Sequence, residues 1–163
     1  MKPTRAFSPH GTYFITTNAW SRRPIFGAVN LARIFFKSFY HYRAKGAYLL
    51  HEFVLMPDHL HAIVTPAPHV TLERVVQYIK GSASWRLKAE NVFSGEVWQP
   101  GFTDHRIRDA ADYAIHRRYI RNNPVKRRLA ESPEQYPYCS AYPGYKLDAW
   151  PPSAAEAAHS RTP

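Results

Sequence analysis

An α+β fold around an antiparallel sheet is predicted by three features of this sequence. Stretches rich in β-branched and aromatic residues, which favour strands, lie at 11–20, 47–56 and 59–66. Only Pro57-Asp58 separates the second and third stretches, and these residues favour a turn, so the two stretches are expected to form a hairpin. Two segments with apolar residues at steps of three and four flank that hairpin and are typical of amphipathic helices.

The first helix is expected between Asn30 and Lys45. Its apolar residues recur at the spacing of one helical face, at Leu31, Ile34, Phe35, Phe39 and Tyr42. Asn30 is a suitable N-cap, and Gly46 follows the segment at a position where helices commonly end.

The second helix is expected to run from a cap at Thr71 to about Ala89. Its apolar face is formed by Leu72, Val75, Val76, Ile79, Ala83 and Leu87. A short strand and a loop are predicted within 97–108. Asp109 then opens a third helix that stops near Pro124, because proline cannot donate a helical hydrogen bond.

The resulting order, β-α-β-β-α-β-α, indicates a ferredoxin-like sheet with its helices packed on one face. The other face would then be free for a ligand or a partner. A chain of 163 residues corresponds to about one domain. We expect an N-terminal arm at 1–10, a domain at 11–148 and a flexible tail rich in Ala and Pro at 149–163.

The charge balance indicates an anionic partner. The chain has 22 Lys and Arg residues against 12 Asp and Glu, which gives a formal net charge of +10 and a pI near 9.9. Nucleic acid is the first candidate partner, an anionic membrane surface is the second, and a basic surface without a partner is the third.

Several classes of protein are excluded by composition. No run of about 18 apolar residues is present, so no transmembrane helix is expected. The N-terminal residues lack the apolar core of a signal peptide. The single cysteine, Cys139, excludes an intramolecular disulfide framework and multi-thiolate zinc sites, and it fits a reducing cytoplasm.

Two histidines of the second hairpin strand are candidate metal ligands. Residues two apart in a strand share a face, so His59 and His61 present their imidazoles side by side while Leu60 points to the other face. Two adjacent imidazoles are a natural ligand pair for a divalent metal. Chance alone also produces such pairs in a chain with nine histidines, but polar side chains in an otherwise apolar strand need a reason to be there.

Tyr119 and Asn123 lie four residues apart near the end of the third helix and therefore project from the same face. Asn supplies a carbonyl oxygen, which suits Mg²⁺ or Mn²⁺ beside imidazole. The phenol of Tyr119 is a nucleophile once it is deprotonated or assisted by a metal. The alternative role for this tyrosine is packing in the core.

Three motifs in this order resemble the single-tyrosine HUH transposases, and most closely the REP-associated tyrosine transposases of bacteria. The motifs extend over most of the chain, from about residue 10 to residue 143. They are Met56-Pro57-Asp58-His59-Leu60-His61, the stretch Trp98-Gln99-Pro100 with Phe102, His105, Ile107 and Arg108, and Tyr119-Ile120-Arg121-Asn122-Asn123-Pro124-Val125. The Ile79-Lys80-Gly81-Ser82 segment also resembles this family.

The resemblance implies an HUH fold and a cytoplasmic bacterial enzyme that nicks single-stranded DNA and transfers strands at repetitive extragenic palindromes or transposon-end hairpins. Tyr119 would attack the phosphodiester, leaving a 5′-phosphotyrosine and a free 3′-OH. His59, His61 and Asn123 match the metal ligands. Some relatives carry Gln at the position of Asn123, which bears on the metal preference. Tyr113 lies on the same helix but faces differently and lacks the Tyr-Ile-x-x-Asn-Pro context.

The expected partner is single-stranded or hairpin DNA, bound by basic side chains and by aromatic stacking. Candidate DNA-binding residues are Arg22, Arg23, Lys80, Arg86, Arg106, Arg108, Arg117, Arg118 and Lys126. About half of these are expected to contact nothing. His105 has three candidate roles: it could contact the metal-ligating side chains without binding the metal itself, contact DNA, or pack in the core. The resemblance favours a monomer that does not bind membranes and that associates with the nucleoid through DNA.

Two other functions are compatible with the same residues. One is a DNA-hairpin-binding protein that keeps the fold but does not cut. The other is a metal-dependent hydrolase of nucleotides, which would use metal-bound water and tolerate the loss of Tyr119. A zinc deaminase is excluded, because it needs a Cys-x-x-Cys pair and this chain has one cysteine.

Overall fold

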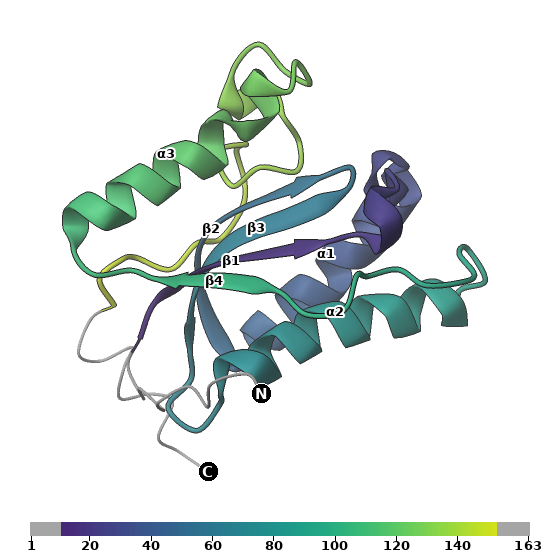
Figure 1. Cartoon of the computed structure of the whole chain (residues 1–163), viewed down its shortest axis with the longest axis horizontal. Helices are drawn as coiled ribbons and strands as arrows, with labels where there is room; N and C mark the ends of the chain where they lie inside the picture. Colours follow the sequence, from purple (N-terminus) through teal and green to yellow (C-terminus); the bar gives the residue numbers. More distant parts are fainter. Residues whose placement is uncertain (1–10, 153–163) are drawn as a thin grey trace.

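A four-stranded antiparallel sheet lies between two layers of helices in the computed structural model, which describes residues 11–152 (Figure 1). The strand order across the sheet is β2-β3-β1-β4, the arrangement of a ferredoxin-like fold. The strands are β1 (Tyr13–Asn18), β2 (Tyr48–Met56), β3 (His59–Pro66) and β4 (Thr103–Arg106). The predicted α+β class and the order of elements are confirmed. The expected arm at 1–10 and most of the tail at 149–163 lie outside the described residues.

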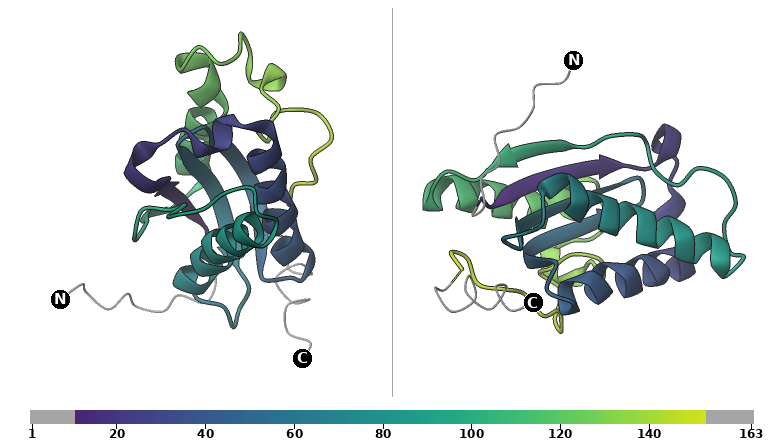
Figure 2. Two further views of the ribbon diagram at one scale, coloured as in Figure 1. Left: turned by 90° about the vertical axis from the view of Figure 1, so that its right-hand side faces the viewer. Right: turned by 90° about the horizontal axis from the view of Figure 1, so that it is seen from below.

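Two helices, α1 (Val29–Ala44) and α2 (Leu72–Ala89), lie side by side on one face of the sheet (Figure 2). The core between them and the sheet is apolar and rich in aromatic rings. Phe35, Phe39 and Phe53 are fully buried there, with ring centroids of neighbouring pairs 5.2 to 5.5 Å apart. This layer supplies most of the apolar burial of the fold.

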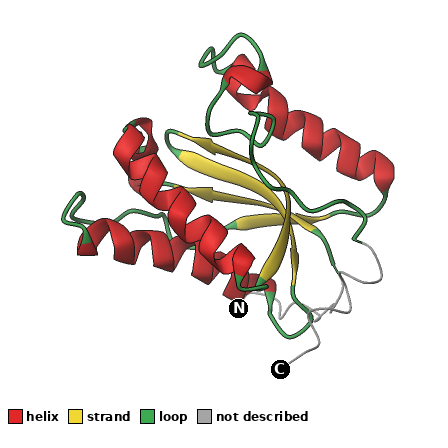
Figure 3. Ribbon diagram, turned by 180° about the vertical axis from the view of Figure 1, so that it is seen from behind, coloured by secondary structure: helices red, strands yellow, loops and turns green. Residues whose placement is uncertain are grey.

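The third helix, α3 (Ala110–Lys126), lies on the opposite face of the sheet (Figure 3). The expectation that all helices share one face is therefore correct for α1 and α2 and wrong for α3. A smaller apolar cluster fills the space beneath α3, and it includes Val54, Met56, Ile63 and Ile120. The second face of the sheet is consequently enclosed by α3 over part of its area and is not entirely free.

The helix boundaries follow the predicted caps in two cases of three. The side chain of Thr71 accepts a hydrogen bond from the backbone N–H of Arg74, and that of Asp109 accepts one from Asp112. The cap prediction at Asn30 is wrong, because α1 begins one residue earlier and Ala28 precedes it without a side-chain cap.

The proline in α3 does not end the helix. Pro124 lies inside α3, which continues to Lys126, because a proline this close to the end removes only one helical hydrogen bond. None of the helices between residues 11 and 152 combines the length and the apolar character that a membrane span requires.

A buried carboxylate on β2 ties α3 to the sheet. Glu52 is 2% exposed, and its carboxylate accepts hydrogen bonds from Arg117 Nε at 2.8 Å and Arg121 Nη2 at 3.0 Å. The hydroxyl of Ser140 also donates to it. A β-bulge between Leu50 and Glu52 shifts the strand alternation, so that Glu52 faces α3 while Leu50 packs in the α1/α2 core.

Replacing Glu52→Gln is expected to destabilise the fold by about 3 kcal/mol, because two guanidinium groups then lose their buried anionic partner. Urea denaturation followed by circular dichroism measures this loss. Glu131→Gln changes an exposed residue and should stay within about 0.5 kcal/mol of wild type. Equal midpoints for the two variants would show that Glu52 does not anchor α3.

Candidate functional site

The two histidines of β3 lie side by side on the face that α3 covers. The ring centroids of His59 and His61 are 4.6 Å apart, and both side chains are buried. Leu60, between them, packs in the core on the other face of the sheet. The face assignment predicted from strand alternation is therefore confirmed.

One ring nitrogen of each histidine is held by a neighbouring side chain. Nδ1 of His59 lies 2.6 Å from Oδ1 of Asp58, and Nδ1 of His61 lies 2.7 Å from Oγ1 of Thr16. Asp58 is held in turn by Arg22, at 2.9 Å. Such contacts at Nδ1 fix the orientation of each ring and direct its Nε2 lone pair toward a ligand.

Both histidines are neutral at physiological pH. Burial, reinforced by the neighbouring His59, lowers the pKa of His61 to about 3. Burial also lowers the pKa of His59, although the hydrogen bond with Asp58 acts in the opposite direction. Arg22 and Arg127 add to the lowering at both rings, which places two guanidinium charges around the pair. Neutral imidazole is the form that ligates a metal ion.

Tyr119 of α3 lies directly beside this pair. Its ring centroid is 5.2 Å from that of His61 and 5.9 Å from that of Phe14. The residue remains 48% exposed, so a ligand can reach its hydroxyl from solvent. Helix α3 thus brings a phenol from distant sequence to the edge of the histidine pair.

Tyr113, the other tyrosine of α3, has a different environment. Its ring stacks on Trp150 at a centroid distance of 4.4 Å with an interplanar angle of 8°. Burial raises the pKa of Tyr113 to about 12, which makes its phenolate less accessible. The two tyrosines face different neighbours, as the spacing on the helix predicts.

Asn123 lies one helical turn after Tyr119 and is buried. Its Oδ1 atom has no hydrogen-bond partner. Buried polar atoms are nearly always satisfied, so an unpartnered amide oxygen on the face of Tyr119 fits a position for a cation. Imidazole nitrogens such as those of His59 and His61 and an amide oxygen such as that of Asn123 are donor types that suit a divalent metal ion.

A second group of ligand-type side chains lies between β4 and the first half of α3. The ligand atoms of His105, Asp112 and His116 lie within 4.8 Å of one another, so this cluster could also hold a divalent metal. His105 Nε2 donates to Asp112 Oδ2 at 2.8 Å, and the two imidazoles stack at 4.5 Å. His105 is thus paired with α3 through Asp112. Phe14 connects the two clusters, because its ring lies 5.3 Å from His61 and 4.8 Å from His116.

Several of the predicted DNA-binding cations are engaged within the protein. Arg22 pairs with Asp58, Arg108 with Asp112, and Arg117 with Glu52. Lys80 donates to the backbone carbonyls of Gln99 at 2.7 Å and Gly101 at 2.8 Å, and burial lowers its pKa. These four therefore have structural roles that the sequence did not indicate.

The other five predicted cations lie in four places. Arg23 contacts the Phe93 ring at 5.8 Å, and Arg86 lies on α2. Arg106 is on β4 and is exposed. Arg118 and Lys126 are exposed on α3, the helix that carries Tyr119.

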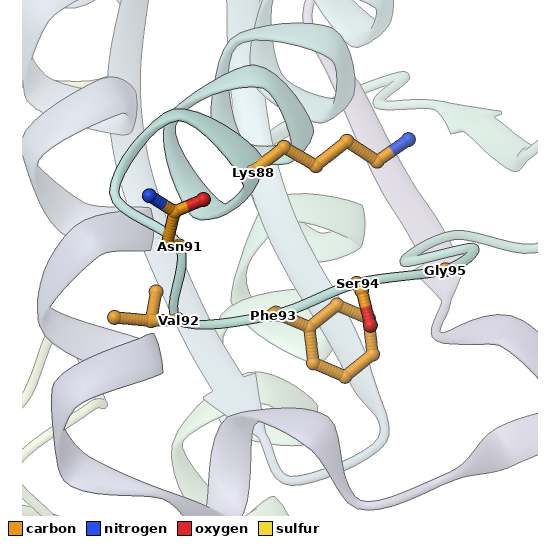
Figure 4. Close-up of a pocket in the computed structure, with 6 residues that line it drawn as sticks. All are labelled: Lys88, Asn91, Val92, Phe93, Ser94 and Gly95. Atoms are coloured by element: carbon orange, nitrogen blue, oxygen red, sulfur yellow. The ribbon is translucent and has the colours of Figure 1, made fainter.

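A hollow of about 370 Å³ follows the end of α2 and is distinct from this site (Figure 4). It is lined by Lys88 and residues 91–95, and the side chains of Lys88, Asn91 and Ser94 point to different sides of it. Polar groups do not converge on this hollow, so it lacks the usual character of a ligand site.

Sequence reasoning did not identify Phe14, Thr16, Asp112 or His116 as parts of the site. Thr16 faces His61 through the register of β1 on β3, which is a contact between distant parts of the chain. Asp58 could have been found, because it directly precedes the histidine pair and carboxylates commonly orient ligating histidines.

The sequence is similar to a known transposase family and to individual bacterial proteins. The family described as "Transposase IS200 like" matches residues 10–123, more than half of the chain. The REP-associated tyrosine transposase of Escherichia coli K12 is 27% identical over 139 residues, which cover 82% of this chain and 78% of that protein. An uncharacterized protein of Haemophilus influenzae is 32% identical over 97 residues, and the chain spans only 53% of its length.

A solved structure has the same fold. A REP-associated tyrosine transposase bound to a REP hairpin superposes with a TM-score of 0.71 over 85% of this chain and 81% of that chain. The two sequences are 23% identical, so this likeness establishes the ferredoxin-like architecture.

The Asp112 cluster should make the stability of the fold pH-dependent. Burial alone would raise the pKa of Asp112, but hydrogen bonds from His105 and Arg108 hold it well below its usual range. The stabilisation is therefore complete above the unfolded-state pKa of about 3.9 and is lost progressively as the pH falls from there through the much lower pKa of the folded state. Asp112→Asn should unfold at a lower temperature than wild type at pH 7, and this difference should begin to shrink below about pH 4 and persist in part at pH 3.

Thermal denaturation with EDTA present, at intervals from pH 7 to pH 3, measures this difference without a metal contribution. A gap between wild type and Asp112→Asn that stays constant over this range would contradict an ion-pair role.

Proposed function

The chain belongs to the IS200-like transposase family, and from this premise we propose that it nicks single-stranded DNA and transfers strands with Tyr119 as nucleophile. The observation that carries the proposal is the exposed phenol of Tyr119 beside the ring of His61, 5.2 Å away between centroids. A nucleophile must be accessible to the DNA and lie next to the groups that hold the reacting phosphate. Tyr113, stacked on Trp150, does not meet this condition.

The proposed reaction conserves the energy of the phosphodiester bond. The Tyr119 oxygen forms a bond to phosphorus, the bond from phosphorus to the 3′ oxygen breaks, and the phenolic proton ends on the departing 3′ oxygen. The products are a 5′-phosphotyrosine and a free 3′-OH. A second 3′-OH can attack the phosphotyrosine and rejoin DNA without ATP, because no high-energy bond has been lost.

His59, His61 and Asn123 are the residues proposed to hold a divalent ion, Mg²⁺ or Mn²⁺. Such an ion supplies Lewis-acid stabilisation of the phosphate and orients the scissile bond. The chain supports this with Asp58 and Thr16, which fix the two rings. Partial burial would raise the pKa of Asp58, but His59 and Arg22 keep it low, so the group that orients His59 is a carboxylate.

The proposed substrate is a DNA hairpin with a single-stranded flank, in the cytoplasm of a bacterium. The Escherichia coli relative is named a REP-associated tyrosine transposase, and a solved structure shows such a transposase bound to a REP hairpin. Arg106, Arg118 and Lys126 are exposed on the elements around Tyr119 and can meet phosphates. Tyr119 reaches the histidines of its own chain, which supports a monomer that completes the site by itself.

Tyr119→Phe should abolish the covalent protein–DNA adduct, because it removes the attacking oxygen and keeps the ring. The substrates are single-stranded DNA hairpins with flanks, a REP hairpin among them, labelled at the 5′ or the 3′ end and incubated with Mn²⁺. A 5′-phosphotyrosine transfers the 3′ label to the protein and releases the 5′-labelled fragment. Denaturing electrophoresis detects both products.

Tyr113→Phe is the matched control on the same helix and should retain the adduct. An adduct that persists in Tyr119→Phe would overturn the assignment of the nucleophile. Cleavage without any adduct would indicate hydrolysis by metal-bound water, and binding without cleavage would indicate a protein that only binds hairpins.

Asp58→Asn is expected to weaken Mn²⁺ binding by about 10- to 100-fold, since it removes the carboxylate that orients His59. Isothermal titration calorimetry of the protein without DNA measures the affinity. Asp112→Asn probes the other cluster and should leave this affinity within about twofold of wild type if the ion binds at His59 and His61. The opposite ranking would place the ion at His105, Asp112 and His116.

A further inference from the structure

A groove on the outer surface of the α1 and α2 layer has the features of a second contact for nucleic acid. It has a volume of about 440 Å³. The helices that line it, α1 and α2, lie across the sheet from α3, so the groove is separate from the Tyr119 site (Figure 2). The side chains that carry the argument are His41, Tyr42, Arg74, Tyr78, Trp85 and Arg86.

Trp85 is the most exposed of the large apolar side chains described, at 68%. The opposite face of α2 is packed in the core through Ile79, Ala83 and Leu87, so Trp85 is directed outward by the helical period. An indole exposed to water is available to stack on a planar partner such as a nucleic-acid base.

The groove contains a second aromatic platform that is already ordered. The rings of Tyr42 and Tyr78 stack at a centroid distance of 4.5 Å with an interplanar angle of 9°. The Arg74 guanidinium lies 5.9 Å from the centre of the Tyr78 ring. Tyr78 and Trp85 are seven residues apart on α2 and therefore lie along one face of it.

Gly81 leaves space between these two rings. Glycine inside a helix lowers the stability of the helix relative to alanine. Apart from the adjacent residues and the backbone of the helix itself, no atom lies within 4 Å of where a Cβ would be at Gly81, so close packing against other parts of the chain does not explain its presence. The open position keeps room for a flat group between Tyr78 and Trp85.

The basic side chains of the groove favour an anionic partner. Its lining residues include Arg74, Arg86 and His41 and no carboxylate. Exposed aromatic rings with basic groups around them are typical of surfaces that bind single-stranded nucleic acid, where bases stack and phosphates meet cations.

We propose that this groove binds unpaired bases of the single-stranded DNA that flanks the substrate hairpin, with Trp85 and Tyr78 stacking on bases and Arg74 and Arg86 pairing with phosphates. The inference rests on the proposed function, because it takes the DNA substrate from it. The groove would extend the footprint of the protein on DNA to the face away from Tyr119 and hold the flank while the reaction proceeds on the other face.

Fluorescence anisotropy tests this with two labelled oligonucleotides, a hairpin with long single-stranded flanks and the same hairpin without them. Trp85→Ala should weaken binding of the flanked hairpin by about tenfold and leave binding of the bare hairpin unchanged. Trp85→Phe retains a ring and should lose less than Trp85→Ala. Tyr142→Ala removes an exposed ring outside the groove and should bind both oligonucleotides as wild type does.

Four outcomes decide the matter: three would overturn the proposal and one would leave it standing. Equal affinity of Trp85→Ala and wild type for the flanked hairpin would overturn the proposal, as would an equal loss on both oligonucleotides. Displacement of the labelled flanked hairpin by an acidic peptide and not by oligo(dT), followed by the same anisotropy, would also overturn the proposal and indicate a protein partner. If the wild-type protein forms no covalent adduct with DNA but the predicted differences in binding are observed, the nicking function is refuted and the groove proposal stands.

Discussion

The position of α3 on the sheet depends on the buried carboxylate of Glu52, which needs charged partners. Glu52 is buried in β2, and a buried charge without partners would cost the fold several kcal/mol. Arg117 and Arg121, one helical turn apart, both form ion pairs with Glu52, and Tyr119 lies between them in the sequence of α3. Satisfying Glu52 therefore fixes where α3 lies along the sheet, and with it the place of the phenol beside His61.

Much of this arrangement can be predicted from the sequence, because it depends on local patterns. Strand alternation puts His59 and His61 on one face, and the Thr71 and Asp109 caps start their helices at the expected residues. The helical spacing separates Tyr113 from Tyr119. These features need only the chain within a few residues of each position.

The parts that could not be predicted depend on contacts between distant segments. The bulge in β2 that turns Glu52 toward α3 leaves no clear pattern in an apolar strand. Thr16 and Phe14 reach the site only through the register of β1 on β3. The side of the sheet that α3 covers is likewise decided by partners such as Glu52, which lies 65 residues from Arg117 in sequence.

Different interactions hold the helices on the two faces of the sheet: apolar packing holds α1 and α2, and ion pairs hold α3. The α1 and α2 layer is held by an apolar core, and hydrophobic contact has no preferred direction, so such a layer tolerates small rotations of a helix. Helix α3 buries few apolar side chains and is held by hydrogen-bonded carboxylates at Glu52 and Asp112. Charge-assisted hydrogen bonds are directional, so they fix the rotation of α3 about its own axis. A helix that directs one phenol toward a phosphate, which is the role proposed for α3, needs that rotation fixed. The proposed role therefore gives a physical reason for ion pairs rather than further leucines on this face of the sheet.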